Sequence, residues 1–388
     1  MTEFDDIRPY NDSEVLPTLE RLFADAEFLD TITKWRLPKF KMAAPLVRPF
    51  VRRALRKQAA GIMSISDFQA RVETYLKGVI KTTTTSLTVS GLDALDSGKA
   101  YCFVSNHRDI AMDSAFVNWC LYRHGAQTLR IAIGDNLLTK PFASDLMRLN
   151  KSFIVKRSAK SPREKLKVAK QLSQYIHHSL VNDQSNMWIA QREGRAKDGL
   201  DKTNPAIVSM LALNKDKPQS LSDYIHQLQI VPVAISYEFD PCDSLKAHEL
   251  YMIGKHGSYE KKEHEDVASI AYGITGFKGN VHLAFGEPLQ DEYATTDDVV
   301  AEIDRQILSN YVLHPTNCIA YEMLEQQSPK VLVSAGGIPF HEAKCQPIRE
   351  LFQQRVAACD ERWRDFLVRA YANPVYTRLG QSAESDAM

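Results

Sequence analysis

Residues 102–113 read Cys-Phe-Val-Ser-Asn-His-Arg-Asp-Ile-Ala-Met-Asp. An apolar, β-prone run ends at Ser105, and a segment with helical spacing follows and stops at Gly125. The pattern predicts a strand that delivers His107 to a loop at the start of a helix. A neutral imidazole takes a proton from an alcohol well when a carboxylate on its other ring nitrogen fixes the tautomer. His107 is therefore a candidate general base with Asp109 or Asp113 as its partner; the alternative is a purely structural histidine.

Similar β-prone runs recur on both sides of this stretch and alternate with helical patterns. The candidate strands are 86–90, 100–105, 128–134, 152–156, 186–190, 229–237 and 280–285. The candidate helices among and before them are 66–80, 114–124, 161–181 and 203–213. Strands that alternate with helices indicate a mostly parallel sheet flanked by helices, which is the α/β class.

Three regions follow from this pattern. Residues 1–84 form an N-terminal helical region with a basic amphipathic helix, 85–295 an α/β core, and 296–388 a C-terminal helical extension. In the extension, helical spacing begins near Asp297 and a final amphipathic helix covers Ile348–Tyr371. The charged stretch 255–266 is predicted to be a surface excursion, and residues 381–388 a frayed tail.

Composition narrows the functional class only in part. Forty-eight basic and 48 acidic side chains give a formal net charge of zero, so charge alone gives no argument for nucleic acid. Six cysteines without a C-x-x-C pair indicate a reducing compartment and no structural zinc. The acidic N-terminus lacks a signal-peptide pattern, and no run of about 18 apolar residues suggests a transmembrane helix. A cytoplasmic protein is expected.

Residues 34–57 carry basic charge without any compensating carboxylate. The basic residues are Lys34, Arg36, Lys39, Lys41, Arg48, Arg52, Arg53, Arg56 and Lys57, and Trp35 and Phe40 lie among them. The apolar residues Leu46, Val47, Phe50, Val51, Ala54 and Leu55 form one helical stripe. Such a helix can lie on an anionic bilayer, where each cation contributes roughly 1 kcal/mol. It can equally pack on the domain with a solvated basic face, whereas RNA binding lacks a recognisable module.

A catalytic site is suggested by four stretches of sequence taken together, 106–113, 149–158, 188–199 and 230–237. The first three place charged residues at the ends of strands, and in a parallel sheet those ends lie together and bind ligands. The basic residues concerned are Lys156, Arg157, Arg195 and Lys197. Beside a histidine base they suit an anionic substrate with a hydroxyl group, since guanidinium and ammonium groups bind phosphate. Each feature also has a purely structural interpretation. Lys156 and Arg157 can mark an exposed strand end, Glu193 and Gly194 can form a turn, and Pro232 can mark an edge strand or a bulge.

In order and spacing these stretches resemble blocks I to IV of the glycerolipid acyltransferases, over roughly residues 85–290. The resemblance implies transfer of a fatty acyl group from acyl-CoA or acyl-carrier protein to a glycerophosphate hydroxyl. It implies that His107 is the general base and that the block I aspartate orients it. It assigns the substrate-binding residues Arg108, Lys156, Arg157, Glu193, Gly194, Arg195, Lys197 and Pro232: the cations hold phosphate, Glu193 and Gly194 shape the acceptor site, and the Pro232 strand supports the acyl donor.

Two departures from the family pattern leave questions open. Five residues separate His107 from Asp113, one more than the family usually has, so Asp109 is an alternative partner, although Asp113 is favoured at the start of the helix. Gln191 and Arg192 replace an aromatic residue and a proline before Glu193. The expected acceptor is 1-acyl-sn-glycerol 3-phosphate, which gives phosphatidate in phospholipid biosynthesis. Glycerol 3-phosphate, acyl-thioester hydrolysis and a non-catalytic, membrane-peripheral lipid-binding protein are the alternatives.

The family also sets expectations for partners and place in the cell. No metal or bound cofactor is expected. The partners are the acyl donor, the phosphorylated glycerol acceptor and an anionic membrane surface contacted through 34–57, without nucleic acid. The expected location is cytoplasmic, peripherally associated with the inner face of the membrane.

Overall fold

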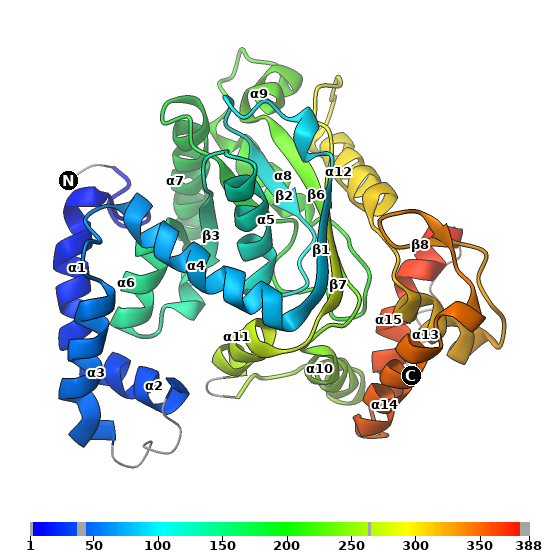
Figure 1. Ribbon diagram of the computed structural model, residues 1–388. Helices are drawn as coiled ribbons and strands as arrows, with labels where there is room; N and C mark the ends of the chain where they lie inside the picture. The colour runs from blue at the N-terminus through cyan, green and yellow to red at the C-terminus, as the bar shows by residue number, and fades with distance from the viewer. Residues whose placement is uncertain (1–2, 37–43, 263–264, 381–388) are drawn as a thin grey trace. The chain divides into compact units, whose positions relative to one another are not determined.

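The computed structural model describes residues 3–36, 44–262 and 265–380 (Figure 1). The chain divides into two compact units, Met1–Leu76 with Leu129–Tyr175, and Lys77–Thr128 with Ile176–Met388. Two of the three boundaries fall within helices, α4 (Ile65–Thr83) and α7 (Pro162–Val181), and the third lies between Thr128 and Leu129, before the next strand. This division is based on packing and does not test the three predicted regions 1–84, 85–295 and 296–388. They stay a prediction.

The sheet of the larger unit is built around β2 (Cys102–Ser105), which is fully buried. Two strands, β5 (Met187–Ala190) and β6 (Ile230–Tyr237), flank it in parallel, with Cys102 opposite Met187 on one side and Ile230 on the other. The antiparallel neighbour of β6 is β7 (Gly279–Phe285), which pairs in parallel with β1 (Thr84–Ser90). Apart from the β6–β7 pair, the strand pairs described in this sheet are parallel, which confirms the predicted mostly parallel sheet.

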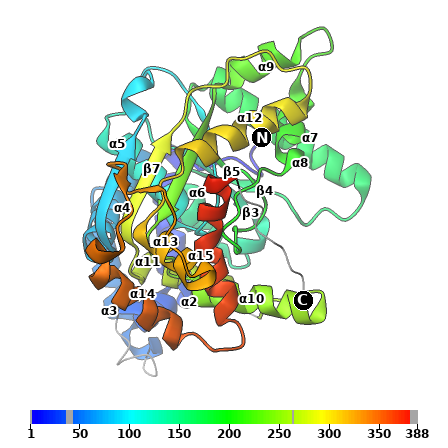
Figure 2. The same ribbon diagram turned by 90° about the vertical axis from the view of Figure 1, so that its right-hand side faces the viewer.

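Helices of the larger unit pack around this sheet, and the helices after β7 form the C-terminal part of the chain (Figure 2). They are α5 (Met112–Arg123), α8 (Pro205–Leu211), α9 (Leu221–Leu228), α10 (Asp243–His256), α11 (Glu265–Thr275), α12 (Thr296–Asn310), α13 (Pro315–Glu325), α14 (Gln346–Ala358) and α15 (Arg364–Leu379). A short hairpin of β8 (Leu332–Val333) and β9 (Ile338–Pro339) separates α13 from α14. The last helix, α15, packs against α13 and α10.

The prediction of one final helix over Ile348–Tyr371 is wrong, because the structure has two helices there, α14 and α15. The Arg364 guanidinium ends α14 by donating to the main-chain oxygens of Val356 and Cys359. Such a side-chain donor satisfies carbonyls that a continuing helix would have bonded. The amphipathic pattern runs across the break because both helices bury apolar residues, Phe352 in α14 and Leu367 in α15.

Several helices were not predicted from the sequence, namely α6 (Pro141–Leu149), α9, α10 and α11. The predicted surface excursion 255–266 lies between α10 and α11, and its first and last residues belong to these helices. Residues 263–264 of it, and the predicted tail 381–388, lie outside the described residues.

The smaller unit is helical apart from β3 (Arg130–Gly134), which pairs in parallel with β4 (Ser152–Val155). Its complete helices are α1 (Asp12–Ala24), α2 (Ala26–Arg36), α3 (Ala44–Gln58) and α6, and the first parts of α4 and α7 also belong to it. The core consists of Val15, Leu19, Leu22, Phe23, Phe28, Ile62 and Leu149. These residues come from α1, α2, α6 and the loop before α4, so apolar packing holds the helices of this unit together.

The predicted basic amphipathic helix is α3, and the residues of its apolar stripe differ in burial. Val51 is buried, whereas Leu46 and Phe50 are 79% and 75% exposed. Two of its cations have acidic partners, since Arg48 pairs with Asp30 at 2.7 Å and Arg56 with a glutamate of α1. The basic stretch also includes residues 39–41, which lie outside the described residues. Within the described part of the chain, no helix combines the length and the apolar composition needed to cross a membrane.

Candidate active site

The strand ends of the larger unit bring the His107 loop and the 191–199 loop together. Because β2 and β5 run in parallel with Ser105 opposite Ala190, both loops leave the same edge of the sheet. Hydrogen bonds continue beyond the strands, from Gln191 N to Ser105 O at 2.7 Å and from Ala196 N to His107 O at 2.7 Å. Two of the four predicted blocks are therefore directly hydrogen-bonded at this edge.

Asn106 anchors the chain just before His107. Its buried side-chain amide donates to Asp201 Oδ2 at 2.9 Å and to Ile235 O at 3.0 Å. Its Oδ1 accepts from Ile235 N at 2.7 Å. A buried amide that uses its donors and its acceptor is held in one orientation. The histidine therefore starts from a fixed backbone position relative to β6.

Asp113, rather than Asp109, contacts the histidine. Asp113 Oδ2 lies 2.9 Å from His107 Nδ1, and the same oxygen accepts from the main-chain nitrogens of Arg108 and Asp109 at 2.7 and 2.9 Å. Its other oxygen, Oδ1, accepts from the Tyr237 hydroxyl at 2.7 Å. The extra residue in the loop is accommodated because the chain curls around this carboxylate, which is fully buried at the first turn of α5.

Asp109 organises the loop instead. Its Oδ1 accepts from Ala111 N and Met112 N at 2.9 and 2.8 Å. Its Oδ2 is buried without a hydrogen-bond partner among the described residues. Burial, together with repulsion from Asp113, raises the pKa of Asp109. This carboxyl group therefore holds the turn at Ala111 and Met112, whereas the His107 ring contacts Asp113.

The His107–Asp113 pair has the geometry of a general base. With Nδ1–H donated to the carboxylate, Nε2 carries the lone pair that can accept a proton. The ring packs edge-on against Trp188, with 6.0 Å between ring centroids, and the side chain is 13% exposed. A mostly buried imidazole whose Nδ1 is held by a carboxylate suits proton abstraction from a bound hydroxyl group.

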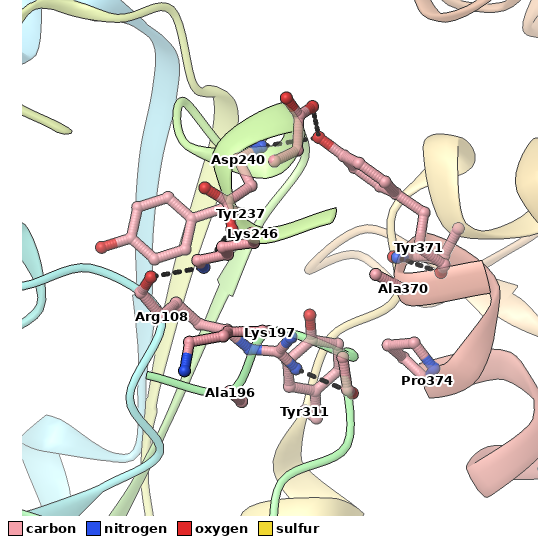
Figure 3. A pocket seen from close by; sticks show the side chains of 13 residues that line it. Arg108, Ala196, Lys197, Tyr237, Asp240, Lys246, Tyr311, Ala370, Tyr371 and Pro374 are labelled. Atoms are coloured by element: carbon pink, nitrogen blue, oxygen red, sulfur yellow. Dashed lines mark hydrogen bonds and ion pairs between the residues drawn. The ribbon is translucent and has the colours of Figure 1, made fainter. Parts of the chain in front are cut away.

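Arg108, the residue after His107, lines a pocket (Figure 3). Arg108 donates to Asp201 Oδ2 at 2.6 Å, and its guanidinium stacks 5.2 Å from the Tyr311 ring centroid. Lys246, which is buried, donates to the main-chain oxygen of Arg108 at 2.6 Å and pairs with Asp240. Burial acts to raise the pKa of Asp240, but the Lys246 ammonium, the Cys242 main-chain N–H group and the Arg195 charge together lower it.

The opposite wall of the pocket comes from the C-terminal region. Tyr371 of α15 donates its hydroxyl proton to Asp243 at 2.9 Å and accepts from Asp240 N at 2.8 Å. Gly199 packs so closely on α15 that a Cβ there would lie 2.0 Å from the Ala370 main-chain oxygen. Figure 3 shows Tyr371 and Ala370 across the pocket from Lys246. The C-terminal helices therefore hold both the 191–199 loop and the loop after β6.

The predicted phosphate-binding residues of the third block differ in their surroundings. Arg195 is buried, and its Nη2 donates to the Ser269 hydroxyl at 3.3 Å, while Nη1 has no hydrogen-bond partner in the described part of the chain. Lys197 forms an ion pair with Glu249 at 2.8 Å. Glu193 and Gly194 are exposed, and Gly194 has a φ of +74° with open space around it. Its positive φ is the conformation that glycine adopts most readily.

Lys156 and Arg157 belong to the smaller unit. There Lys156 pairs with Asp6, and the Arg157 main-chain nitrogen donates to Asp135 Oδ1 at 3.1 Å. Their role toward the acceptor stays a prediction.

Pro232 lies in β6, which has a partner strand on each side, so it marks neither an edge strand nor a bulge. Opposite Pro232 on the β2 side is Val104, while the pairs with β7 start at Val233. The missing N–H of Pro232 therefore breaks no bond of the β6–β7 ladder.

Two residues near the histidine, Tyr237 and Lys246, were not predicted from the sequence. Tyr237 ends the apolar fourth block, where a tyrosine looks like an ordinary strand residue. Lys246 lies within α10, which was not predicted, among other charged residues. In the described residues, no group of three or more His, Cys, Asp or Glu side chains is arranged to hold a metal ion.

Comparison with known proteins agrees with the sequence pattern. Residues 86–236 match the family model described as Acyltransferase. A search of curated proteins finds no match. One solved structure with similarity is the 1-acyl-sn-glycerophosphate (LPA) acyltransferase PlsC from Thermotoga maritima, at 15% identity and a TM-score of 0.35, covering 74% of this chain and 91% of that one. The matched residues contain the His107–Asp113 pair, so this part of the chain is similar to the acyltransferase family.

Proposed function

We propose that this protein transfers a fatty acyl group from acyl-CoA or acyl-carrier protein to the hydroxyl group of 1-acyl-sn-glycerol 3-phosphate, giving phosphatidate. The observation that carries the proposal is the His107–Asp113 contact of 2.9 Å at the edge where the 191–199 loop is bonded to His107. It joins a general base to the loop that resembles the family's phosphate-binding block.

The reaction needs one proton carrier and no covalent enzyme intermediate. Nε2 of His107 takes the proton of the acceptor hydroxyl as its oxygen attacks the thioester carbonyl. The tetrahedral intermediate then collapses, the C–S bond breaks, and the leaving thiolate receives the proton from the imidazolium. Throughout, Asp113 stabilises the charged ring. A general base of this kind contributes roughly 10²–10⁴-fold in rate, and positioning and charge stabilisation supply the remainder.

Arg195 supports a phosphorylated acceptor. Its guanidinium is buried, and Nη1 has no hydrogen-bond partner among the described residues. A buried donor without a partner is unfavourable, and phosphate oxygens match the geometry of a guanidinium. Lys197 would have to exchange Glu249 for the phosphate, so Arg195 is the primary anion-binding group of this loop.

The membrane is the proposed source of the lipid acceptor, and α3 is the proposed contact. Leu46 and Phe50 lie one turn apart and are both largely exposed, and Arg53 and Lys57 are exposed on the same helix. Exposed apolar side chains next to cations suit insertion into the headgroup region of an anionic bilayer. The ion pairs of Arg48 and Arg56 reduce the charge that is free for lipid. A protein that binds through this helix would be peripheral, and we propose that it associates with the inner face of the membrane.

The test is an acyl-transfer assay with the purified full chain. Labelled acyl-CoA and, separately, acyl-carrier protein are offered with 1-acyl-sn-glycerol 3-phosphate and with glycerol 3-phosphate, and His107→Ala serves as the control. We expect phosphatidate formation that His107→Ala nearly abolishes. Product from glycerol 3-phosphate alone would assign the first acylation instead. Absence of transfer to either acceptor, with vesicle binding intact, would favour the non-catalytic lipid-binding alternative.

A further inference from the structure

Tyr237 connects β6 to the catalytic carboxylate. It is the last residue of β6 and lies just beyond the part of the chain that matches the family model. Its ring is buried, and its hydroxyl donates to Asp113 Oδ1 at 2.7 Å across 124 residues of sequence. The same strand bonds Asn106 through Ile235. Both the start of the His107 loop and the carboxylate that orients the ring are therefore attached to β6.

The two oxygens of Asp113 have unequal surroundings. Oδ2 accepts from three donors, the His107 ring and two main-chain N–H groups of the loop. For Oδ1 the structure gives one donor, Tyr237. Rotation of the carboxylate about its terminal torsion would separate Oδ2 from the ring, because this torsion is soft in aspartate. A rigid aromatic side chain that holds Oδ1 prevents that rotation.

The surroundings of the Tyr237 hydroxyl keep it protonated. Burial is the main cause that raises its pKa well above the usual value, and the carboxylates of Asp113, Asp109 and Asp240 add to the shift. The charged groups nearby also include Arg108 and Lys246, which line the same pocket. In Figure 3 the Tyr237 ring lies beside Lys246 and Arg108. The hydroxyl is therefore a permanent hydrogen-bond donor to Asp113.

We propose that Tyr237 is a positioning residue for proton transfer at His107, acting by holding the Asp113 carboxylate in the plane in which Oδ2 faces Nδ1. The inference rests on the proposed function of His107 as general base. Tyr237 touches neither the ring nor the reacting atoms. Its effect passes through the orientation and the charge of Asp113.

The variant that tests this is Tyr237→Phe, which removes one oxygen atom and keeps the ring. The matched control is Tyr293→Phe, because Tyr293 is also buried and its hydroxyl has no hydrogen-bond partner among the described residues. In Tyr237→Phe we expect kcat to fall about tenfold or more, since a hydrogen bond to a charged group is lost, with KM little changed. The acid limb of the kcat/KM profile should move to higher pH, because the less satisfied carboxylate attracts the imidazolium more strongly.

A readout without activity separates this proposal from the proposed function. In protein with ¹⁵N-labelled histidine, the Nδ1 proton of His107 is assigned by its loss in His107→Ala. We expect its NMR signal to shift or broaden in Tyr237→Phe and to stay unchanged in Tyr293→Phe. If wild-type protein transfers no acyl group, the proposed function fails and this signal still tests Tyr237. A Tyr237→Phe variant with a lower melting temperature but with wild-type kcat, pH profile and ring-proton signal would overturn the proposal.

Discussion

Replacement of Asp113 by asparagine separates the charge of this residue from its geometry. The amide oxygen can take the place of Oδ2 and accept from the main-chain nitrogens of Arg108 and Asp109 and from the His107 ring. The amide nitrogen then faces Tyr237, whose hydroxyl can rotate and accept the new donor. The loop should therefore keep its shape while the negative charge beside the imidazole is lost.

The size of the effect follows from the ring–carboxylate contact. Nδ1 and Oδ2 lie 2.9 Å apart. The charge centres are then about 4 Å apart, where two unit charges attract by about 4 kcal/mol at an effective dielectric constant near 20. Because the proton is only partly transferred in the transition state, between half and all of this energy is lost. We expect kcat to fall about 30- to 1,000-fold, at roughly 1.4 kcal/mol for each factor of ten.

The assay is steady-state acyl transfer at saturating acceptor, with circular dichroism and thermal unfolding to verify the fold. Asp109→Asn is the matched control, because it keeps both bonds of Oδ1 and places the amide at the unpartnered Oδ2. Its kcat should stay within about threefold of wild type. Wild-type kcat in Asp113→Asn together with a large loss in Asp109→Asn would refute the assignment of Asp113 as the orienting residue.

Three further perturbations test other parts of the molecule. Arg195→Gln should raise KM for the phosphorylated acceptor about tenfold or more with a smaller change in kcat; an unchanged KM would exclude Arg195 from phosphate binding. The double variant Leu46→Ser, Phe50→Ser should reduce cosedimentation with anionic vesicles and leave binding to neutral vesicles low, and unchanged cosedimentation would remove α3 as the contact. Gly194→Ala and Gly199→Ala both place a side chain at positive φ, which costs about 1 kcal/mol. Because only Gly199 packs on the α15 backbone, its variant should lose clearly more stability in urea unfolding, and equal losses would contradict that packing.

Local pattern was sufficient for the secondary structure of the α/β part. Each of the seven predicted strands is present, including short ones such as β4, because apolar runs bounded by polar residues are a local signal. The helix after the His107 loop and α7 were also predicted from their spacing. The apolar pattern did not predict the break between α14 and α15, because it continues across both helices. The Arg364 side chain ends the first of them. It was insufficient too for α10 and α11, in which charged or exposed residues hide the buried face.

The sequence by itself determined the chemical groups of the candidate site: His107, the aspartates that follow it, and the basic residues at later strand ends. Only the tertiary structure decided which of them meet. It placed Asp113 against the ring, gave Lys197 a carboxylate partner, and brought Tyr237 and Lys246 to the loop from more than 120 residues away. The physical reason is that a hydrogen bond depends on the distance and angle between two groups in space. Those quantities are fixed by strand pairing and helix packing, and spacing along the chain does not contain them.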